Sequence, residues 1–267
     1  MIYKSAFLSN YVAQAPLALA FERSLECTLY PGLTFDRPIL DLGCGEGLFA
    51  HILFAEKIDT GIDPNATELK RASELGAYDE LIQCAGDSIP KPDSFYGTVI
   101  SNSVIEHIPD LDPILHEVRR VLKPGGYFYI TAPSQHFERH TLINTLLEIA
   151  GMNKIACGFR AYFNKFWAHY NVHSLEDWGK LFEKAGFEII DAFSYNSKKS
   201  CLLNDALVPI SIPSLILKKL TNQWVLLPGI RRLIVSPVAA ILRRCPTRDQ
   251  KLSDGGLVFF AMRKPTA

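Results

Sequence analysis

The stretch RPILDLGCGEGLFAHIL, residues 37–53, joins an apolar run and an acid to three glycines at every second position, followed by a second apolar run. The first run, 38–43, is typical of a buried strand, and the run from 47 onward is typical of a helix. Glycines at a strand-to-helix turn let the backbone take unusual angles and let a ligand approach it closely. The stretch therefore predicts a ligand site where a strand turns into a helix.

Strand-like and helix-like segments alternate on both sides of this turn. A helix opening at Pro16 precedes it, and the alternation breaks over 134–174 and again over 195–254. Strands separated by helices of this length indicate βαβ crossovers and a mostly parallel sheet. The expected strands are 38–43, 59–63, 81–87, 97–103, 127–133, 187–193 and 255–264.

The composition is that of a chain with a full core and no net charge. Of 267 residues, 48% are apolar, which is enough for one large domain with a cap. Lys plus Arg and Asp plus Glu number 28 each, so nothing drives the chain as a whole toward nucleic acid. The six cysteines form no Cys-x-x-Cys and the N-terminus makes a poor signal peptide, so we expect a reducing, cytoplasmic setting without a structural metal.

The acid before the glycines narrows the choice of ligand. A dinucleotide fingerprint, G-x-G-x-x-G/A, needs a small residue where this chain has Leu48. A pyrophosphate would also be repelled by Asp41 in a site of low dielectric. S-adenosylmethionine carries an ammonium and a sulfonium and no phosphate. The glycines would make room for its ribose and methionine part, and Asp41 would favour its positive charge.

Five segments in order extend this motif: LDLGCGEG, GID, AGD, SNSVIEHIPD and LKPGGYFYITAP. Together they resemble class I S-adenosylmethionine-dependent methyltransferases, closest to the small-molecule branch with the ubiquinone-biosynthesis enzymes. The resemblance covers 36–133 well and 174–193 moderately. It implies a Rossmann-like α/β fold with helices on both faces and a helical cap. The implied sheet has seven strands in the order 3-2-1-4-5-7-6, the last antiparallel.

We divide the chain by this resemblance and by the two breaks in the alternation. The 134–174 and 195–254 insertions should lie over the carboxyl edge of the sheet and shape an acceptor pocket. The segments are 1–35 (N-terminal helical), 36–133 (cofactor-binding core), 134–174 (cap), 175–194 (core helix and strand), 195–254 (apolar and basic insertion) and 255–267 (last strand and tail).

The cofactor residues are expected at the ends of the first four strands. Asp63 suits the ribose hydroxyls, although it could instead cap the next helix. The resemblance implies that Asp87 faces the adenine amino group, where a surface turn is the alternative. The backbone of 101–103 should line the methionine part, and the Asn102 side chain could be structural. The expected set is Asp41, Gly43, Cys44, Gly45, Gly47, Asp63, Pro64, Asp87, Ser88, Ser101, Asn102, Ser103 and His107.

A general base is needed only when the acceptor must lose a proton. The candidates are His107, and His169 with His173, which would share a face if their segment is helical. His107 could instead pack over the cofactor, and the other two could bond to backbone or form two ligands of a metal site without a third. Glu106 is more typical of a charge at a helix start.

The 195–254 insertion is basic as well as apolar. It holds ten Lys or Arg against three acids, with the basic residues in pairs such as Lys218-Lys219 between apolar stretches. No apolar stretch is expected to reach the length of a membrane-spanning helix, because charges or prolines interrupt it. A cap or lid, contact with an anionic membrane and a dimer face stay open. Nucleic acid is disfavoured because aromatic residues are sparse in the insertion, where Trp224 alone follows Tyr195.

These patterns favour a methyltransferase that uses S-adenosylmethionine on a small, apolar or lipid-linked acceptor, with oxygen as the receiving atom. It would be cytoplasmic or peripheral at the inner membrane face. A protein or RNA methyltransferase is an alternative, weakened by the neutral charge and by a fourth strand ending in SNSV instead of an Asn-Pro-Pro-Tyr-type tetrad. A non-catalytic cofactor-binding scaffold is another, and the intact loop with Asp41 and Asp63 weighs against it.

Overall fold

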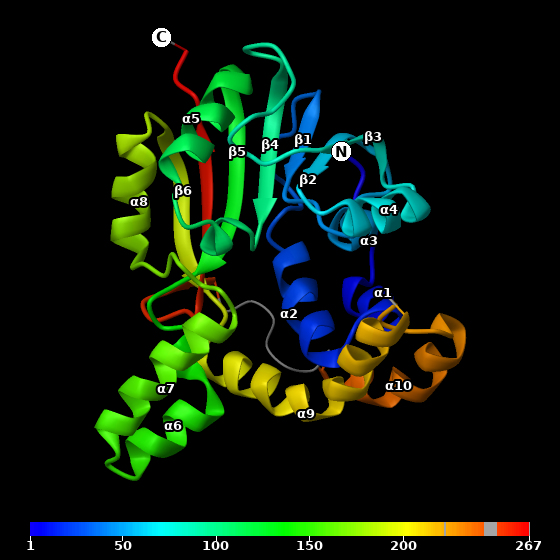
Figure 1. The fold of residues 1–267 in the computed structure, drawn as a ribbon, viewed down its shortest axis with the longest axis vertical. Helices are drawn as coiled ribbons and strands as arrows, with labels where there is room; N and C mark the ends of the chain where they lie inside the picture. Colours follow the sequence, from blue (N-terminus) through cyan, green and yellow to red (C-terminus); the bar gives the residue numbers. More distant parts are fainter. Residues whose placement is uncertain (222, 243–249, 267) are drawn as a thin grey trace.

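The computed structural model describes residues 1–221, 223–242 and 250–266 (Figure 1). The strands are β1 (Ile39–Leu42), β2 (Ile58–Asp63), β3 (Tyr78–Gln83), β4 (Tyr96–Asn102), β5 (Leu122–Pro133), β6 (Glu188–Tyr195), β7 (Gln250–Leu252) and β8 (Leu257–Arg263). The helices are α1 (Phe7–Gln14), α2 (Leu17–Cys27), α3 (Leu48–Leu53), α4 (Ala66–Leu75), α5 (Asp112–Val121), α6 (Leu142–Ile149), α7 (Asn153–Phe166), α8 (Leu175–Lys184), α9 (Lys198–Thr221) and α10 (Pro228–Leu242). Short 3-10 turns lie at Ile105–His107 and Glu138–His140.

The strands form one mixed sheet in the order β3-β2-β1-β4-β5-β8-β6-β7. The expected number of seven strands is wrong, because the described chain has an eighth, β7, paired antiparallel to the end of β6. Without it the order equals the expected 3-2-1-4-5-7-6, with the last core strand, β8, antiparallel to β5. The third strand also begins three residues earlier than expected and ends at Gln83, before the AGD motif.

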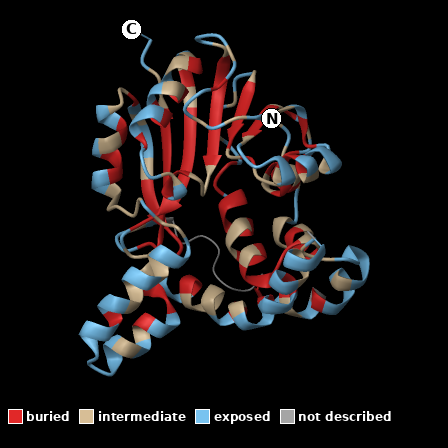
Figure 2. Cartoon of the chain, viewed as in Figure 1, coloured by how far each residue is buried: buried red, intermediate tan, exposed pale blue. Residues whose placement is uncertain are grey.

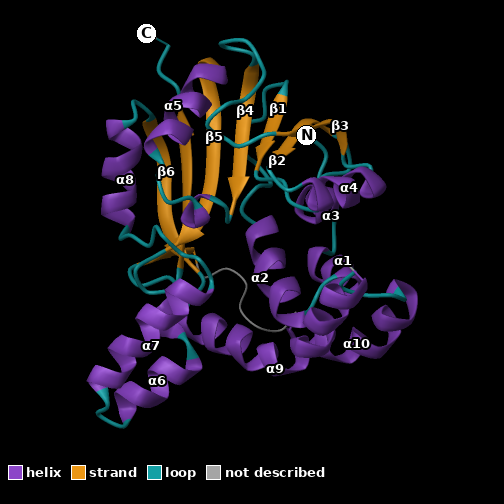
Figure 3. Cartoon of the chain, in the orientation of Figure 1, coloured by secondary structure: helices purple, strands orange, loops and turns teal. Residues whose placement is uncertain are grey.

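Alternate side chains of the central strands enter two separate cores, one on each face of the sheet. Helices α5 and α8 lie toward one side of the sheet and α3 and α4 toward the other (Figure 3). Ile39 packs with α2 and α3 on one face, whereas Leu40 packs with α5 and α8 on the other. Neighbouring residues of a strand point to opposite faces, so a strand buried on both faces is apolar throughout. All four residues of β1 are buried accordingly, including the acid Asp41.

The carboxyl ends of β1 and β4 are neighbours, although their crossover helices leave in opposite directions along the sheet. Ligands of open α/β sheets collect at such a switch point. Helix α2 lies beyond this edge of the sheet, and α6, α7, α9 and α10 lie farther out at the same end of the molecule (Figure 1).

Helix α9 corrects an expectation about the basic and apolar insertion. The helix has 24 residues, and by length and composition alone it is long and apolar enough to cross a membrane. The mean hydropathy of an 18-residue window within it is 1.6. The helix runs through Pro209 and Pro213, which we expected to interrupt it. The basic residues Arg243, Arg244 and Arg248, and the sixth cysteine, Cys245, lie outside the described residues.

Candidate functional site

The glycine loop after β1 has a backbone that ordinary side chains could not follow. Gly43 and Gly47 have φ of 74° and 75°, in the left-handed region. A Cβ on Gly43 would lie 2.4 Å from the Val104 side chain, and one on Gly47 would lie 2.9 Å from the Tyr78 ring. The amides of Gly43 and Cys44 both donate to the Ile62 carbonyl at 2.9 Å, which fixes the loop to β2.

Gly45 is the position in this loop that a ligand can approach. Its φ is 52°, and a Cβ there would meet no protein atom within 4 Å. Its amide donates to Asp63 Oδ2 at 3.0 Å, and the other carboxylate oxygen accepts from the Asn65 amide at 2.8 Å. A carboxylate has about four lone-pair sites, so Asp63 keeps acceptor capacity for hydroxyl groups. The helix-cap alternative for Asp63 fails, because Asn65 accepts from Thr67 N and caps α4.

Asp41 lies beneath the loop, with 3% of its surface exposed. Its Oδ2 accepts a hydrogen bond of 2.6 Å from the Tyr78 hydroxyl. Burial raises the pKa of Asp41 to about 7, and the Tyr78 hydrogen bond opposes that increase. Contact of Asp41 with a cationic ligand therefore stays a prediction. The observed partner of Asp41 is the Tyr78 hydroxyl, and the Tyr78 ring also lies next to Gly47.

We expect Tyr78→Phe to destabilise the protein more at high pH than at low pH. The change removes the donor and so raises the pKa of Asp41 further. A group whose folded pKa lies above its unfolded value loses stability as pH rises through the folded pKa. The deficit in the free energy of unfolding should be small at about pH 5 and reach about 1–3 kcal/mol at about pH 8.

Chemical denaturation at the two pH values measures this, with Tyr195→Phe as the matched control. The buried Tyr195 hydroxyl has no hydrogen-bond partner within the described residues, so its removal should cost no stability at either pH. An equal loss for Tyr78→Phe at both pH values would contradict the assignment.

The end of β4 is tied to α2 by a buried polar network that the sequence did not reveal. Glu26, fully buried, accepts from Arg23 at 2.7 Å and from Asn102 Nδ2 at 2.6 Å. Ser103 donates to Glu26 at 3.1 Å and accepts from Arg23. Asn102 is structural here, as the alternative had it, and Ser101 binds the Leu42 carbonyl at 3.2 Å. The only signal in the sequence was an i,i+3 ion pair inside an apolar helix.

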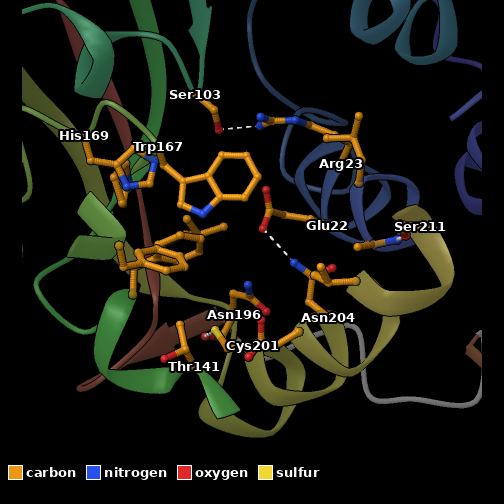
Figure 4. Close-up of a pocket in the computed structure, with 18 of the residues that line it drawn as sticks. Glu22, Arg23, Ser103, Thr141, Trp167, His169, Asn196, Cys201, Asn204 and Ser211 are labelled. Carbon is orange, nitrogen blue, oxygen red and sulfur yellow. Dashed lines mark hydrogen bonds between the residues drawn. The ribbon is translucent and has the colours of Figure 1, made fainter. Parts of the chain in front are cut away.

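A cavity of about 330 Å³ lies beside this network (Figure 4). Trp167 projects into it opposite Glu22, which accepts from Asn204 at 3.1 Å. Both insertions contribute to the wall, together with α2 and the ends of β4 and β5. The lining residues include Leu19, Glu22, Arg23, Ser103, Glu106, His107, Pro133, Phe137, His140, Phe163, Trp167, His169, Asn204, Val208, Leu215 and Trp224.

Two of the three predicted histidines meet at this cavity. The rings of His107 and His169 are 5.3 Å apart between centroids. Desolvation lowers the pKa of His107, and it lowers the pKa of His169 to about 4. Glu106 lies beside them with 3% of its surface exposed, and burial raises its pKa to about 8.

The third histidine lies elsewhere, because α7 ends at Phe166 and the segment after it is not helical. His173 packs edge-on against Trp178, 4.8 Å between ring centroids, and does not line the cavity. Asp87 and Ser88 lie in an exposed turn and Pro64 is exposed as well, so their cofactor roles stay predictions.

The end of α9 and the residues just after it contact the glycine loop. Trp224 donates to Glu46, the residue between Gly45 and Gly47, and Lys218 lies 3.5 Å from the same carboxylate. Arg71 of α4 also pairs with Glu46 at 3.0 Å, and Lys218 sits 4.1 Å from the centre of the Trp224 ring. The insertion therefore contacts the glycine loop and also forms part of the cavity wall.

Known proteins are similar to this chain in sequence and in fold. Residues 13–192 match a family model described as a methyltransferase domain. The chain is 26% identical over 127 residues to a ubiquinone biosynthesis O-methyltransferase of Vibrio atlanticus, a match covering 45% of this chain and 52% of that protein. It is 34% identical over 122 residues to a 2-methyl-6-phytyl-1,4-hydroquinone methyltransferase of Synechocystis, covering 44% and 37%.

The fold also matches a solved S-adenosylmethionine-dependent methyltransferase of Thermotoga maritima, with a TM-score of 0.56, 17% identity and coverage of 93% and 91%. The chain belongs to the class I S-adenosylmethionine-dependent methyltransferase family. The matched region spans about half of the Vibrio relative and less of the Synechocystis one. The open space at Gly45, flanked by the Asp63 carboxylate, fits the family's cofactor.

Proposed function

We propose that the protein transfers the methyl group of S-adenosylmethionine to a small, apolar or lipid-linked acceptor, with oxygen as the receiving atom. The observation that carries this is the cavity at the carboxyl edge of β4, whose wall is largely apolar and holds His107, His169 and Glu106 side by side. The named activities of the two relatives agree with it, since one is an O-methyltransferase and the other acts on a phytyl-substituted hydroquinone.

The bound cofactor supplies a methyl group that is already activated for displacement. The chain has to align the acceptor, exclude water and take a proton from a hydroxyl acceptor. His107 is suited to the last task. Its Nδ1 lies 3.2 Å from the Ala168 carbonyl, so Nδ1 carries the hydrogen and Nε2 is left as an acceptor. Its lowered pKa keeps the ring neutral near neutral pH.

His169 and Glu106 would complete this polar corner. His169 is neutral at pH 7 because of its low pKa, and it is the second candidate for the base. Glu106 keeps its proton near neutral pH because of its raised pKa, so it can donate a hydrogen bond to the acceptor. Its Oε2 is buried and has no hydrogen-bond partner among the described residues, and Glu106 is one of the residues that line the cavity.

Transfer of labelled methyl from S-adenosylmethionine to hydroxylated aromatic and quinol lipids tests the proposal. His107→Ala should lower kcat by roughly 100-fold or more if it takes the proton, and His169→Ala is tested beside it. The exposed His116→Ala is the matched control and should retain activity. S-adenosylhomocysteine binding, measured on each variant, separates loss of chemistry from loss of cofactor.

The pH dependence gives a second readout. A histidine base with a lowered pKa is already deprotonated at neutral pH, so the acid limb of kcat should lie below about pH 6.5. Label found in protein or RNA instead of the small acceptors would make the protein a macromolecular methyltransferase. Tight cofactor binding without transfer to any of these acceptors would favour the scaffold alternative.

A further inference from the structure

Helix α9 does not keep its apolar side chains on its buried side. Its buried residues are three serines with Cys201 and Leu207, and Ser211 Oγ accepts from the Ala18 amide of α2 at 3.1 Å. Its exposed side carries Ile216, 54% exposed, and Leu220, 78% exposed. A surface helix that faces water has the opposite arrangement. The outer side of α9 therefore suits an apolar neighbour.

Exposed residues of α6, α7 and α10 lie at the same end of the molecule as α9 (Figure 2). Among the described residues, the exposed large apolar side chains lie within 142–170 and 210–241, with the exceptions of Ile2 and Ile190. A patch of this extent marks an interaction site. We call it the outer apolar face: Leu142, Ile143, Leu146, Ile149, Met152, Ile155, Tyr162, Phe166, Trp167, Tyr170, Ile210, Ile212, Leu215, Ile216, Leu220, Leu226, Leu227, Ile230, Leu233, Ile234 and Ile241.

The charge around this face favours an anionic partner. Helices α6, α7, α9 and α10 hold nine Lys or Arg against two acids, Glu148 and Asp205. Arg160, Lys218 and Arg231 are bound to groups within the protein, and the six exposed ones are Lys154, Lys165, Lys198, Lys199, Lys219 and Arg232. The rest of the chain holds 19 basic residues against 26 acids. A symmetric dimer would place this basic face against itself, which is repulsive. An anionic lipid surface attracts the basic residues and accepts the apolar ones.

The face is continuous with the cavity. Trp167 is 46% exposed and Leu215 is 37% exposed, and both also line the cavity between α7 and α9. We propose that α6, α7, α9 and α10 dock in the plane of an anionic membrane surface, and that the acceptor enters the cavity from the lipid between Trp167 and Leu215. The second half of this inference rests on the proposed function, and the first half does not.

Co-sedimentation of the full chain with vesicles tests the docking. The protein should pellet with phosphatidylglycerol–phosphatidylcholine vesicles at low salt, and much less with phosphatidylcholine alone or at high salt. Two double variants, Leu233→Glu with Ile234→Glu and Lys219→Glu with Arg232→Glu, should each lower the partition coefficient by roughly tenfold or more. The exposed Ile190→Glu and Lys70→Glu, outside the face, are the matched controls and should leave it unchanged.

Three results would overturn the docking. The protein could stay in the supernatant with anionic vesicles at low salt. Vesicle-bound protein could instead be released only by detergent, and not by salt or carbonate. That result would indicate that α9 spans the membrane. A lipid-free dimer that the Leu233 and Ile234 changes dissociate, without vesicle binding, would make the face a dimer contact. S-adenosylhomocysteine binding, measured in parallel, distinguishes these results from failure of the proposed function, since binding should be the same in all variants.

Discussion

Gly45→Ala should weaken S-adenosylhomocysteine binding by roughly 5- to 150-fold. Nothing in the protein lies within 4 Å of the added methyl group, so its clash would be with the ligand we place in that space. Overpacking by one carbon costs about 1–3 kcal/mol, which corresponds to that range in Kd. Isothermal titration calorimetry on the folded variant measures the change directly.

Gly76→Ala is the matched control for this variant. Gly76 ends α4 with a φ of 64°, and a Cβ there also meets no protein atom within 4 Å. The two changes therefore impose the same kind of backbone strain, about 1 kcal/mol of stability each. Only Gly45→Ala should affect binding. If the two variants bound S-adenosylhomocysteine with equal affinity, the ligand would not lie against Gly45.

Glu26→Ala should lower the stability of the protein by about 3 kcal/mol. The fully buried Glu26 carboxylate is the partner of Arg23, whose side chain is 20% exposed, and removing it leaves a largely buried guanidinium unpaired. For a domain of this size the loss corresponds to a decrease in Tm of roughly 6–12 °C. The Asn102 amide and the Ser103 hydroxyl lose an acceptor in the same change.

The double variant Arg23→Met, Glu26→Gln separates the charge effect from the hydrogen bonds. It removes both charges and keeps an acceptor at position 26, so much of the lost stability should return. Glu176→Ala breaks the exposed pair with Lys180 on α8 and should leave Tm unchanged. Thermal unfolding of the four proteins, wild type included, decides this. A Glu26→Ala variant that melts like the wild type would show that the network adds nothing.

The central strands could be predicted because they are buried on both faces, so β1, β4 and β8 are apolar runs. The start of β3 was missed because it is an edge strand with two exposed acids, Asp79 and Glu80. The three-residue β7 carries no pattern of its own. Helix α9 was misjudged because Pro209 and Pro213 are four apart and both exposed, where a helix tolerates the loss of backbone bonds on one side.

The candidate site, like the fold, could be predicted from the sequence only in part. The glycine loop and Asp63 are local in sequence and were predicted, because strand-end positions determine what lies at the carboxyl edge. The contribution of α2 was not, since Glu26 and Ser103 are 77 residues apart and only the fold brings them together. The separation of His173 from His169 likewise depends on where α7 ends, which the spacing of two histidines does not encode.

A crystal structure of the protein with bound S-adenosylhomocysteine is the most direct measurement of the central claim. We expect the ligand to lie across the carboxyl ends of β1 and β2 and to contact Gly45. A ribose hydroxyl should be within hydrogen-bond distance of the Asp63 carboxylate. A ligand bound away from these residues, or a nicotinamide nucleotide found in the same cleft, would contradict it.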